Sequence, residues 1–361
     1  MVSGFDSVEF AKVSVKKDII MKMKMKIGFD ISQTAHYGGV AVYTQRLAEE
    51  LVKKNDLDLV FFYSSMRKPY PGNLPNVREF KIPPTILELM MNKLRVIPIE
   101  SFIGSVDIFH SSDWIQPKTK AKKVTTYHDV IPLKYPEWSR PKIVAVHQRR
   151  LKIVEKEVDW IIAVSEATKR DLLEISKIRE DQITVIYEAA DPQFKIQDRE
   201  AVESFRKKYN LPDEFVLSIG GVGERRNLTR VKRAVSDKPL IITGESIPLL
   251  DFSEMPLLYS SAKLLLYPSF YEGFGLPVLE AMACEVPVVT SNVSSLPEVG
   301  GDACLYADPL NVDDIREKLD EVWNDKKLRE DLVKKGLKQS SKFSWQKCAS
   351  ETVDVYNKVM E

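Results

Sequence analysis

The chain has 361 residues, of which 44% are hydrophobic and 29% are charged, so it is long enough for two domains and too apolar to be intrinsically disordered. No apolar run approaches the ~20 residues of a membrane-spanning helix, which argues against an integral membrane protein. The three cysteines stand far apart without metal-ligand spacing, so we expect neither a disulfide framework nor a zinc site, and a reducing cytosol fits them.

The net charge of +1 conceals an uneven distribution. Residues 1–210 hold 35 Lys and Arg against 28 Asp and Glu, a net +7, whereas residues 211–361 hold 18 against 24, a net −6. A basic half is typical of proteins that meet phosphates, nucleic acid or an anionic membrane, but a lysine-rich solvated surface also explains it. The basic runs at 118–123 and 149–152, where a membrane contact would lie, lack the interleaved aromatic residues of a nucleic-acid groove. We therefore expect no nucleic acid as a partner.

We expect residues 1–24 to form a disordered tail. They contain Asp6 and Glu9 ahead of any basic cluster and lack the apolar stretch of a signal peptide. Met21, Met23 and Met25 are alternative starting points of the natural product. We expect a cytoplasmic protein, with the inner face of the membrane as a further location.

Residues 25–192 have the pattern of parallel β-α-β units. Short apolar runs predict buried strands at 26–31, 57–63, 108–111, 123–127 and 160–164. After the first strand, apolar residues recur at helical spacing from Val40 to Leu51, which predicts a helix with one buried face. The apolar and basic segment 86–102 is expected to form a buried core helix; the alternative is a surface that lines a binding site or rests on a membrane.

A second α/β series occupies residues 193–344. Its predicted strands are at 215–219, 240–243, 263–267 and 286–290. Residues 345–361 have the pattern of an amphipathic helix, which could pack back on the first domain. The simplest architecture is an α/β fold with two Rossmann-like, doubly wound parallel sheets that face a cleft.

The most informative stretch is YPSFYEGFGLPVLEAM, from Tyr267 to Met282. A strand enters a Gly-x-Gly loop, and Pro277 follows where the first turn of a helix is expected. Free backbone N–H groups at such a helix N-terminus bind anions and hydroxyl oxygens. Glu272 and Glu280 flank the loop, and their carboxylates suit the vicinal hydroxyls of a sugar or ribose. A tight turn with two solvated carboxylates is the alternative, but the strand–loop–helix context favours a ligand site.

Two segments of the first domain are further candidates. Gly38 and Gly39 precede the Val40 helix, so the backbone there can approach a diphosphate closely, although a simple turn would have the same residues. His128-Asp129 follows the strand at 123–127, where the histidine either faces the cleft or has a structural role.

The run GGVGERRN at residues 220–227 follows the strand at 215–219 in the second domain. The guanidinium groups of Arg225 and Arg226 suit a diphosphate. The alternative is that Asn227 caps a helix and both arginines are merely exposed.

These motifs, in this order, resemble those of retaining glycosyltransferase family four, also called glycosyl transferases group 1. The similarity spans roughly residues 26–345 and is strongest with mannosyltransferases at 131–137. It implies the GT-B fold, with an acceptor-side domain at 25–192 and a nucleotide-sugar donor domain at 193–344. It also implies that Glu272 contacts the transferring sugar, that Glu280 holds the ribose and that His128 faces the sugar. The backbone of the same loop would bind the sugar at Gly273, Phe274, Gly275 and Leu276.

What the resemblance implies is a retaining transferase that moves a hexose, mannose first, from a nucleotide diphosphate sugar to a glycan or lipid-linked acceptor. GDP-mannose is the preferred donor over a UDP-hexose such as UDP-glucose, and we expect no cofactor and no metal. Asp56-Leu57-Asp58 matches a metal-binding string of other transferases, but it precedes a strand at the N-terminal edge, where a solvated loop is expected. We expect Glu272, Glu280 and Arg226 to be exposed in one interdomain cleft.

The sequence departs from the family in two places. Only the 45 residues 227–271 separate Arg226 from Glu272, where relatives usually have a further helix and strand beside the base pocket, so the donor domain is shortened. Tyr187-Glu188-Ala189-Ala190-Asp191 stands where many relatives have an Asn-Gly turn. A non-catalytic relative therefore remains an alternative, as does a sugar-nucleotide epimerase on the same architecture.

Overall fold

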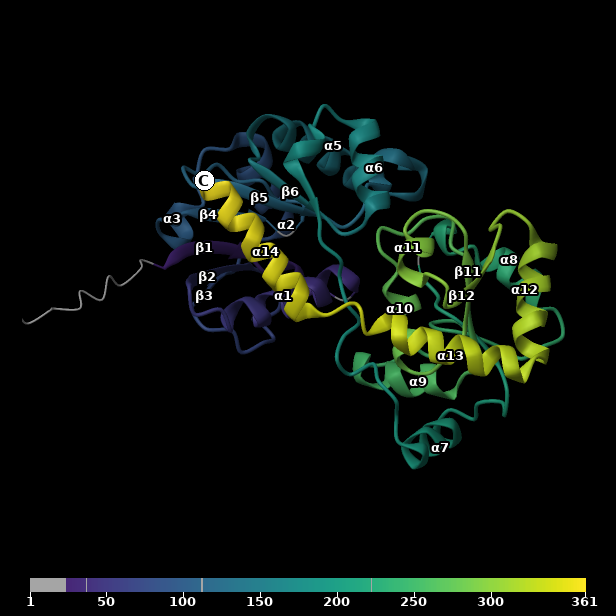
Figure 1. Cartoon of the computed structure of the whole chain (residues 1–361). Coiled ribbons are helices and arrows are strands. Elements are labelled where there is room, and N and C mark those ends of the chain that lie inside the picture. Colours follow the sequence, from purple (N-terminus) through teal and green to yellow (C-terminus); the bar gives the residue numbers. More distant parts are fainter. Residues whose placement is uncertain (1–23, 37, 112, 222) are drawn as a thin grey trace, which may run out of the picture.

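The computed structural model describes residues 24–361 except residues 37, 112 and 222, so residues 1–23 of the predicted tail lie outside the described part. Two α/β domains lie next to each other and are joined by two crossings of the chain (Figure 1). The predicted fold class, two Rossmann-like parallel sheets, is confirmed. In the part of the chain that the structure describes, no helix is both long enough and apolar enough to cross a bilayer.

The first domain has a seven-stranded parallel sheet in the order β3-β2-β1-β4-β5-β6-β7. The strand order reverses between β1 and β4, and loops at the carboxyl ends of such strands are where doubly wound sheets bind ligands. The strands are β1 Met25–Asp30, β2 Leu57–Ser64, β3 Val77–Phe80, β4 Ile108–Ser111, β5 Lys122–Tyr127, β6 Trp160–Ala163 and β7 Ile183–Val185.

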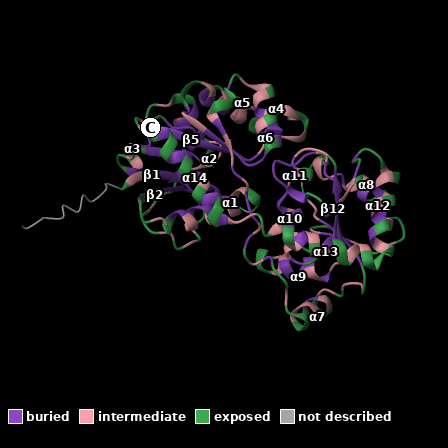
Figure 2. Ribbon diagram, viewed as in Figure 1, coloured by how far each residue is buried: buried purple, intermediate pink, exposed green. Residues whose placement is uncertain are grey.

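Helices cover both faces of this sheet, which accounts for the near-continuous apolar runs of its central strands. Figure 2 shows the strands as mostly buried and the outer helix faces as exposed. The helix predicted from Val40 onward is α1, whose Leu47, Ala48 and Leu51 are fully buried. The helices are α1 Gly39–Val52, α2 Pro84–Glu88, α3 Glu100–Ile103, α4 Ile131–Lys134, α5 Pro141–Glu157 and α6 Glu166–Ile175.

The second domain has a five-stranded parallel sheet in the order β12-β11-β10-β8-β9, which reverses between β8 and β10. Successive residues of β10 face opposite sides: Leu264 and Leu266 pack toward α8 and α12, whereas Leu265 and Tyr267 belong to the core beneath α9 and α10. The strands are β8 Val216–Ser218, β9 Leu240–Ile242, β10 Leu264–Tyr267, β11 Val288–Ser291 and β12 Cys304–Ala307. The helices are α7 Arg199–Lys208, α8 Leu228–Val235, α9 Met255–Ser261, α10 Leu276–Ala283, α11 Leu296–Gly300, α12 Val312–Asn324 and α13 Lys326–Ser340.

The helix α14, Trp345–Met360, lies on the first domain although it follows the second in sequence (Figure 1). Trp345 and Tyr356 belong to the same hydrophobic core as Phe29 and Leu47. The Tyr356 hydroxyl lies 2.7 Å from Nδ1 of the buried His110, so the apolar contact is supplemented by a hydrogen bond.

The prediction of one buried core helix at 86–102 is wrong. A short α2 is followed by a π-helical turn, Leu89–Leu94, and α3 begins only at Glu100. Leu87 and Met91 are buried, but four apolar side chains are exposed, with relative exposures of 47%, 40%, 58% and 68% for Ile86, Leu89, Leu94 and Val96. These four side chains are called the exposed apolar group on 86–96.

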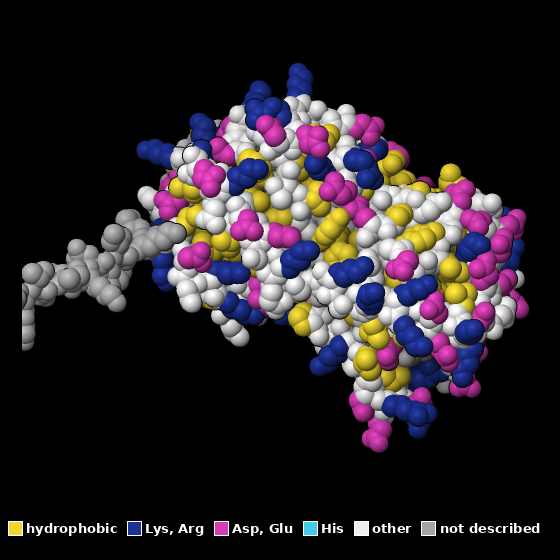
Figure 3. All heavy atoms as spheres, in the orientation of Figure 1, with side chains coloured by type: hydrophobic (Ala, Val, Ile, Leu, Met, Phe, Trp, Pro, Cys, Tyr) yellow, Lys and Arg dark blue, Asp and Glu magenta, His cyan; other side chains and the backbone are white. Residues whose placement is uncertain are grey.

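Charged side chains of both signs are interspersed on the face of the molecule in Figure 3. Acidic side chains are frequent at the end of the second domain, as the negative charge of residues 211–361 predicts.

The packing of α14 predicts a large loss of stability on truncation of its buried aromatic residue. Tyr356→Ala should lower the free energy of unfolding of the first domain by about 3–5 kcal/mol, because it leaves a cavity and removes the bond to His110. The exposed Asn357→Ala on the same helix is the matched control and should change it by less than about 0.5 kcal/mol. Urea unfolding followed by tryptophan fluorescence measures both, and equal effects would contradict the assigned packing.

Candidate active site

The two motif loops of the second domain meet because their strands are neighbours. The loop that contains Arg225 and Arg226 follows β8, and the loop that contains Glu272 follows β10, on either side of the point where the strand order reverses. The carboxyl ends of parallel strands lie at one edge of a sheet, so the loops converge there.

Glu272 is held by both arginines. Its Oε2 lies 2.5 Å from Nη1 of Arg225 and its Oε1 lies 2.8 Å from Nη1 of Arg226, while the Tyr267 hydroxyl donates to Oε1 at 2.8 Å. Glu272 is only 6% exposed, so the predicted exposure in an open cleft is wrong for this residue. A carboxylate can be buried here because two guanidinium groups and a hydroxyl compensate its charge.

Asn227 does not cap α8 through its side chain, which was the alternative interpretation of this run. It has a left-handed backbone with φ of 56°, and its side-chain amide donates to the carbonyl oxygens of Pro268 at 3.0 Å and Pro309 at 2.7 Å. Asn227 therefore ties the arginine loop to the Glu272 loop.

The Gly-x-Gly loop opens α10 as predicted. Gly275 precedes the helix with φ of 110°, a backbone conformation that favours glycine. Within the described residues, the backbone N–H groups of Gly273, Phe274 and Gly275 donate to no acceptor. The Phe274 side chain is buried in the domain core, 6.0 Å from the Tyr187 ring. This loop can thus offer a ligand its backbone but not the Phe274 ring.

Glu280 lies one helical turn beyond the loop and accepts a hydrogen bond of 2.7 Å from the Tyr259 hydroxyl. Burial raises the pKa of Glu280 to about 7, and the hydrogen bond from Tyr259 and the charge of Arg226 offset only part of that effect. Burial also lowers the pKa of Arg226, which the Glu272 carboxylate opposes. Arg226 therefore acts on both carboxylates, so Glu272, Glu280 and Arg226 share one neighbourhood.

The first domain contributes the start of α1. Gly38 has φ of 118°, and a Cβ placed on Gly39 would lie 3.1 Å from the Leu276 side chain. The N-terminus of α1 therefore abuts that of α10 across the domain boundary. Two helix N-termini at one place favour an anion.

His128 is buried beside Glu188, with its Nδ1 2.9 Å from Oε1 of that carboxylate. Burial lowers the pKa of His128, but the hydrogen bond and charge of Glu188 outweigh it, so the net direction is upward. The Tyr43 ring packs edge-on against the His128 ring with centroids 4.6 Å apart. Sequence reasoning missed Glu188 as a site residue, and its only signal was the departure from an Asn-Gly turn.

The domains are in contact through the backbone of the Glu272 loop. A Cβ on Gly273 would lie 1.8 Å from the carbonyl oxygen of His128, so a glycine is required there for this approach. Ser165 caps α6 through its side chain and also donates to the carbonyl oxygen of Gly273 at 2.5 Å. Glu298 of the second domain accepts hydrogen bonds from the first two backbone N–H groups of α6, at 2.9 and 3.0 Å. These contacts describe a closed arrangement.

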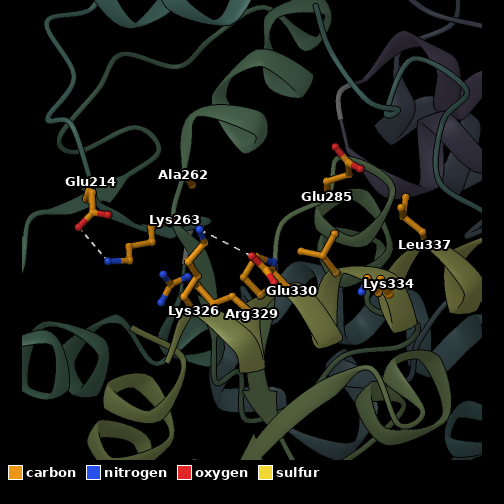
Figure 4. A pocket seen from close by; sticks show the side chains of 11 residues that line it. Glu214, Ala262, Lys263, Glu285, Lys326, Arg329, Glu330, Lys334 and Leu337 are labelled. Atoms are coloured by element: carbon orange, nitrogen blue, oxygen red, sulfur yellow. Dashed lines mark hydrogen bonds and ion pairs between the residues drawn. The ribbon is translucent and has the colours of Figure 1, made fainter. Parts of the chain in front are cut away.

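Neither of two other features adds to this site. Asp56 and Asp58 are exposed at the N-terminal end of β2, away from the motif loops, and no group of three or more potential ligands suits a metal in the described part of the chain. A groove of about 510 Å³ lies at the opposite edge of the second sheet, lined by Lys263, Pro287, Arg329 and other residues that the candidate site does not use (Figure 4).

The raised pKa of Glu280 predicts a pH-dependent stability cost. Because the folded protein binds the Glu280 proton more tightly than the unfolded chain, stability falls as pH rises from about 4.3 to about 7. Glu280→Gln, which keeps an acceptor for Tyr259, should therefore be more stable than the parent at pH 8 by on the order of 2 kcal/mol, with the gain shrinking toward pH 5. Melting temperatures across pH 5–8 test this. The exposed Glu330→Gln should show no such trend, and a Glu280→Gln gain independent of pH would refute the assignment.

Comparisons with known proteins agree with the resemblance. The model of the family "Glycosyltransferase Family 4" matches residues 37–194, and that of "Glycosyl transferases group 1" matches residues 168–339. The O-antigen chain mannosyltransferase B of Escherichia coli is 30% identical over 280 residues, covering 69% of this chain and 74% of that protein. The serotype-specific mannosyltransferase WbdA of the same species is also 30% identical, but the chain spans only about a third of its length.

Solved structures show the same fold. Sucrose-phosphate synthase from Thermosynechococcus elongatus superposes with a TM-score of 0.75 at 19% identity, covering 93% of this chain and 99% of that one. HepE of Anabaena, solved with UDP-glucose, has a TM-score of 0.68 at 14% identity over 92% of this chain and 100% of that one. With matched family models over both domains and motif loops that meet at the strand-order reversal, the chain belongs to glycosyltransferase family 4, the glycosyl transferases group 1, and has the GT-B fold.

Proposed function

We propose that the protein transfers mannose from GDP-mannose to a glycan or lipid-linked acceptor, with retention of configuration and without a metal. The observation that supports it best is the pairing of Glu272 with Arg225 and Arg226 beside the backbone N–H groups of Gly273 to Gly275, which have no acceptor among the described residues. Similarity to proteins named as mannosyltransferases favours mannose as the sugar.

In this proposal the donor diphosphate lies between the two arginines and the N-termini of α1 and α10. All of these groups favour negative charge, so they stabilise the leaving diphosphate without a divalent cation. Glu272 accepts hydrogen bonds from hydroxyls of the sugar, and Glu280 accepts them from the ribose. The loop backbone from Gly273 to Leu276 donates to sugar oxygens.

The proposed reaction is a displacement on one face of the sugar. The bond from C1 to the phosphate oxygen breaks with its electron pair leaving on the diphosphate, and the acceptor hydroxyl attacks C1 from the side being vacated. The hydroxyl proton passes to the departing phosphate oxygen. Retention follows because attack and departure share a face. His128 stabilises the sugar, and the closed contacts around Gly273 exclude water that would otherwise hydrolyse the donor.

We infer that Glu272 anchors the sugar and is not a covalent nucleophile. Its carboxylate oxygens are already engaged by two arginines, which lowers their reactivity toward an electrophilic carbon.

Transfer should depend on the charge at position 226. With GDP-mannose, Arg226→Gln should lower kcat/KM by about 10²–10³-fold, because it removes a donor to the developing charge, whereas Arg226→Lys keeps the charge and should stay within about tenfold. Arg230→Gln is a control three residues beyond the motif, where the guanidinium contacts the Leu310 carbonyl instead of Glu272. Radiolabel transfer measures the rate, and NMR of the product gives its anomeric configuration.

Each other outcome has a distinct meaning. A product of inverted configuration, or a covalent glycosyl adduct on Glu272, would overturn the mechanism. Faster transfer from UDP-glucose would replace the donor. Epimerisation of the donor sugar in the absence of acceptor would identify an epimerase. Titration calorimetry that detects no binding of any nucleotide diphosphate would identify a non-catalytic relative.

We further propose that the exposed apolar group on 86–96 rests on an anionic membrane surface, where a lipid-linked acceptor would be found. Four exposed apolar side chains in this segment accompany the exposed Lys93, a combination that suits the boundary between headgroups and acyl chains.

Vesicle binding tests the membrane contact. Leu94→Ser combined with Val96→Ser should weaken co-flotation with vesicles containing phosphatidylglycerol by about tenfold, since both side chains are exposed and their loss costs no core packing. Leu249→Ser is the matched control, because Leu249 is 86% exposed on the other domain. Equal loss in both variants, or no binding by the parent protein, would refute the contact.

A further inference from the structure

Glu188 is a buried carboxylate without an assigned role. It is 4% exposed and lies on the first crossing between the domains, three residues after β7. Its Oε1 lies 2.9 Å from Nδ1 of His128, which is itself 9% exposed. Burying a carboxylate costs free energy unless it is paired, and His128 is the partner of Glu188. The contact is therefore a built feature of the interior and not a chance surface ion pair.

The backbone around Glu188 is held on both sides. Trp345 donates its indole N–H to the carbonyl oxygen of Ala190 at 3.0 Å, and Arg46 pairs with Asp191 at 2.6 Å. Ile186 and Ala189 are buried in the core of the first domain. The Glu188 carboxylate is therefore fixed relative to α1 and α14, and it can in turn fix the ring of His128.

The His128 ring is supported on a second side by α1. Tyr43 packs edge-on against it, and the Tyr43 hydroxyl lies 3.0 Å from Oγ1 of Thr126. Thr126 also contacts Nε2 of His110 at 2.9 Å, which connects this support to Tyr356 of α14. The Tyr43 ring that packs on His128 is thus itself held by hydrogen bonds that continue to α14.

We propose that Glu188 is a positioning residue for sugar transfer, which orients His128 and keeps its imidazole doubly protonated so that Nε2 acts as a hydrogen-bond donor in the site. This inference rests on the proposed function and identifies a residue outside the motifs described above. With Nδ1–H donating to Glu188, a neutral ring would leave Nε2 an acceptor, whereas the charged ring makes it N–H. A donor suits a sugar or phosphate oxygen that gains negative charge in the transition state.

Other charged or titratable groups surround the pair. Tyr43 comes from α1, His110 from β4, Asp113 from the loop after β4, Arg150 from α5 and Cys348 from α14. Of these, Asp113 raises the pKa of His128 and Arg150 lowers it, both less than Glu188 does. The Glu188 carboxylate is thus the main favourable partner of the charged ring.

Glu188→Gln tests the inference, because it keeps an acceptor oxygen and the side-chain volume but removes the charge. In full-length protein labelled with ¹³C and ¹⁵N at histidine, the titration midpoint of His128 should fall by about one pH unit in this variant. The chain has four histidines, and His128→Gln assigns the signal. The alkaline limb of kcat/KM for transfer from GDP-mannose should move to lower pH by a similar amount.

Glu49→Gln is the control, since it removes a carboxylate that pairs with Arg46 at 2.7 Å on α1 and does not touch His128. Glu49→Gln should change neither the titration midpoint of His128 nor the alkaline limb of kcat/KM. An unchanged His128 midpoint in Glu188→Gln, or a loss of rate that is uniform across pH and parallels a fall in melting temperature, would overturn the inference. If the parent protein transfers no sugar, the titration midpoint of His128 still shows whether Glu188 keeps the ring protonated. Failure of the proposed function can therefore be told apart from failure of this inference.

Discussion

The candidate site depends on one arrangement of charge, in which the Glu272 carboxylate lies between the guanidinium groups of Arg225 and Arg226. In sequence, Glu272 lies 47 residues after Arg225 and 46 after Arg226. The two loops meet because β8 and β10 are neighbours where the strand order reverses. The Glu272 charge can be buried because the two partly buried guanidinium groups compensate it. These ion pairs hold the three side chains in place, so little binding free energy would go to ordering them.

The domain contact extends this arrangement to the first domain through backbone atoms. Gly273 approaches the carbonyl oxygen of His128, and Ser165 of α6 donates to Gly273 in return. The N-terminus of α1 reaches that of α10 at the same boundary. Positive ends of two helices and two arginines are thus gathered around a single pair of carboxylates, Glu272 and Glu280. Such a place favours an anionic ligand that bridges the domains.

The sequence predicts the centre of the fold better than its edges. The central strands and the strand–loop–helix at 267–282 are recognisable because parallel strands buried on both faces are continuous apolar runs. The three unpredicted strands, β3, β7 and β12, all lie at sheet edges and are only partly buried, so their residues lack that pattern. The pairing of Arg226 with Glu272 follows from strand adjacency that no local pattern encodes. The pairing of Glu188 with His128 could not be predicted either, because the two residues are 60 positions apart in sequence.

The placement of α14 has a consequence for how the protein is made. The core of the first domain, which includes Phe29 and Leu47, is completed by Trp345 and Tyr356. A ribosome synthesises those residues only after the whole of the second domain, whereas domains usually fold in the order in which they emerge. Residues 199–340 can therefore fold first, and the earlier-made domain waits for the helix that closes it. Until then its unfinished apolar surface is a target for chaperones.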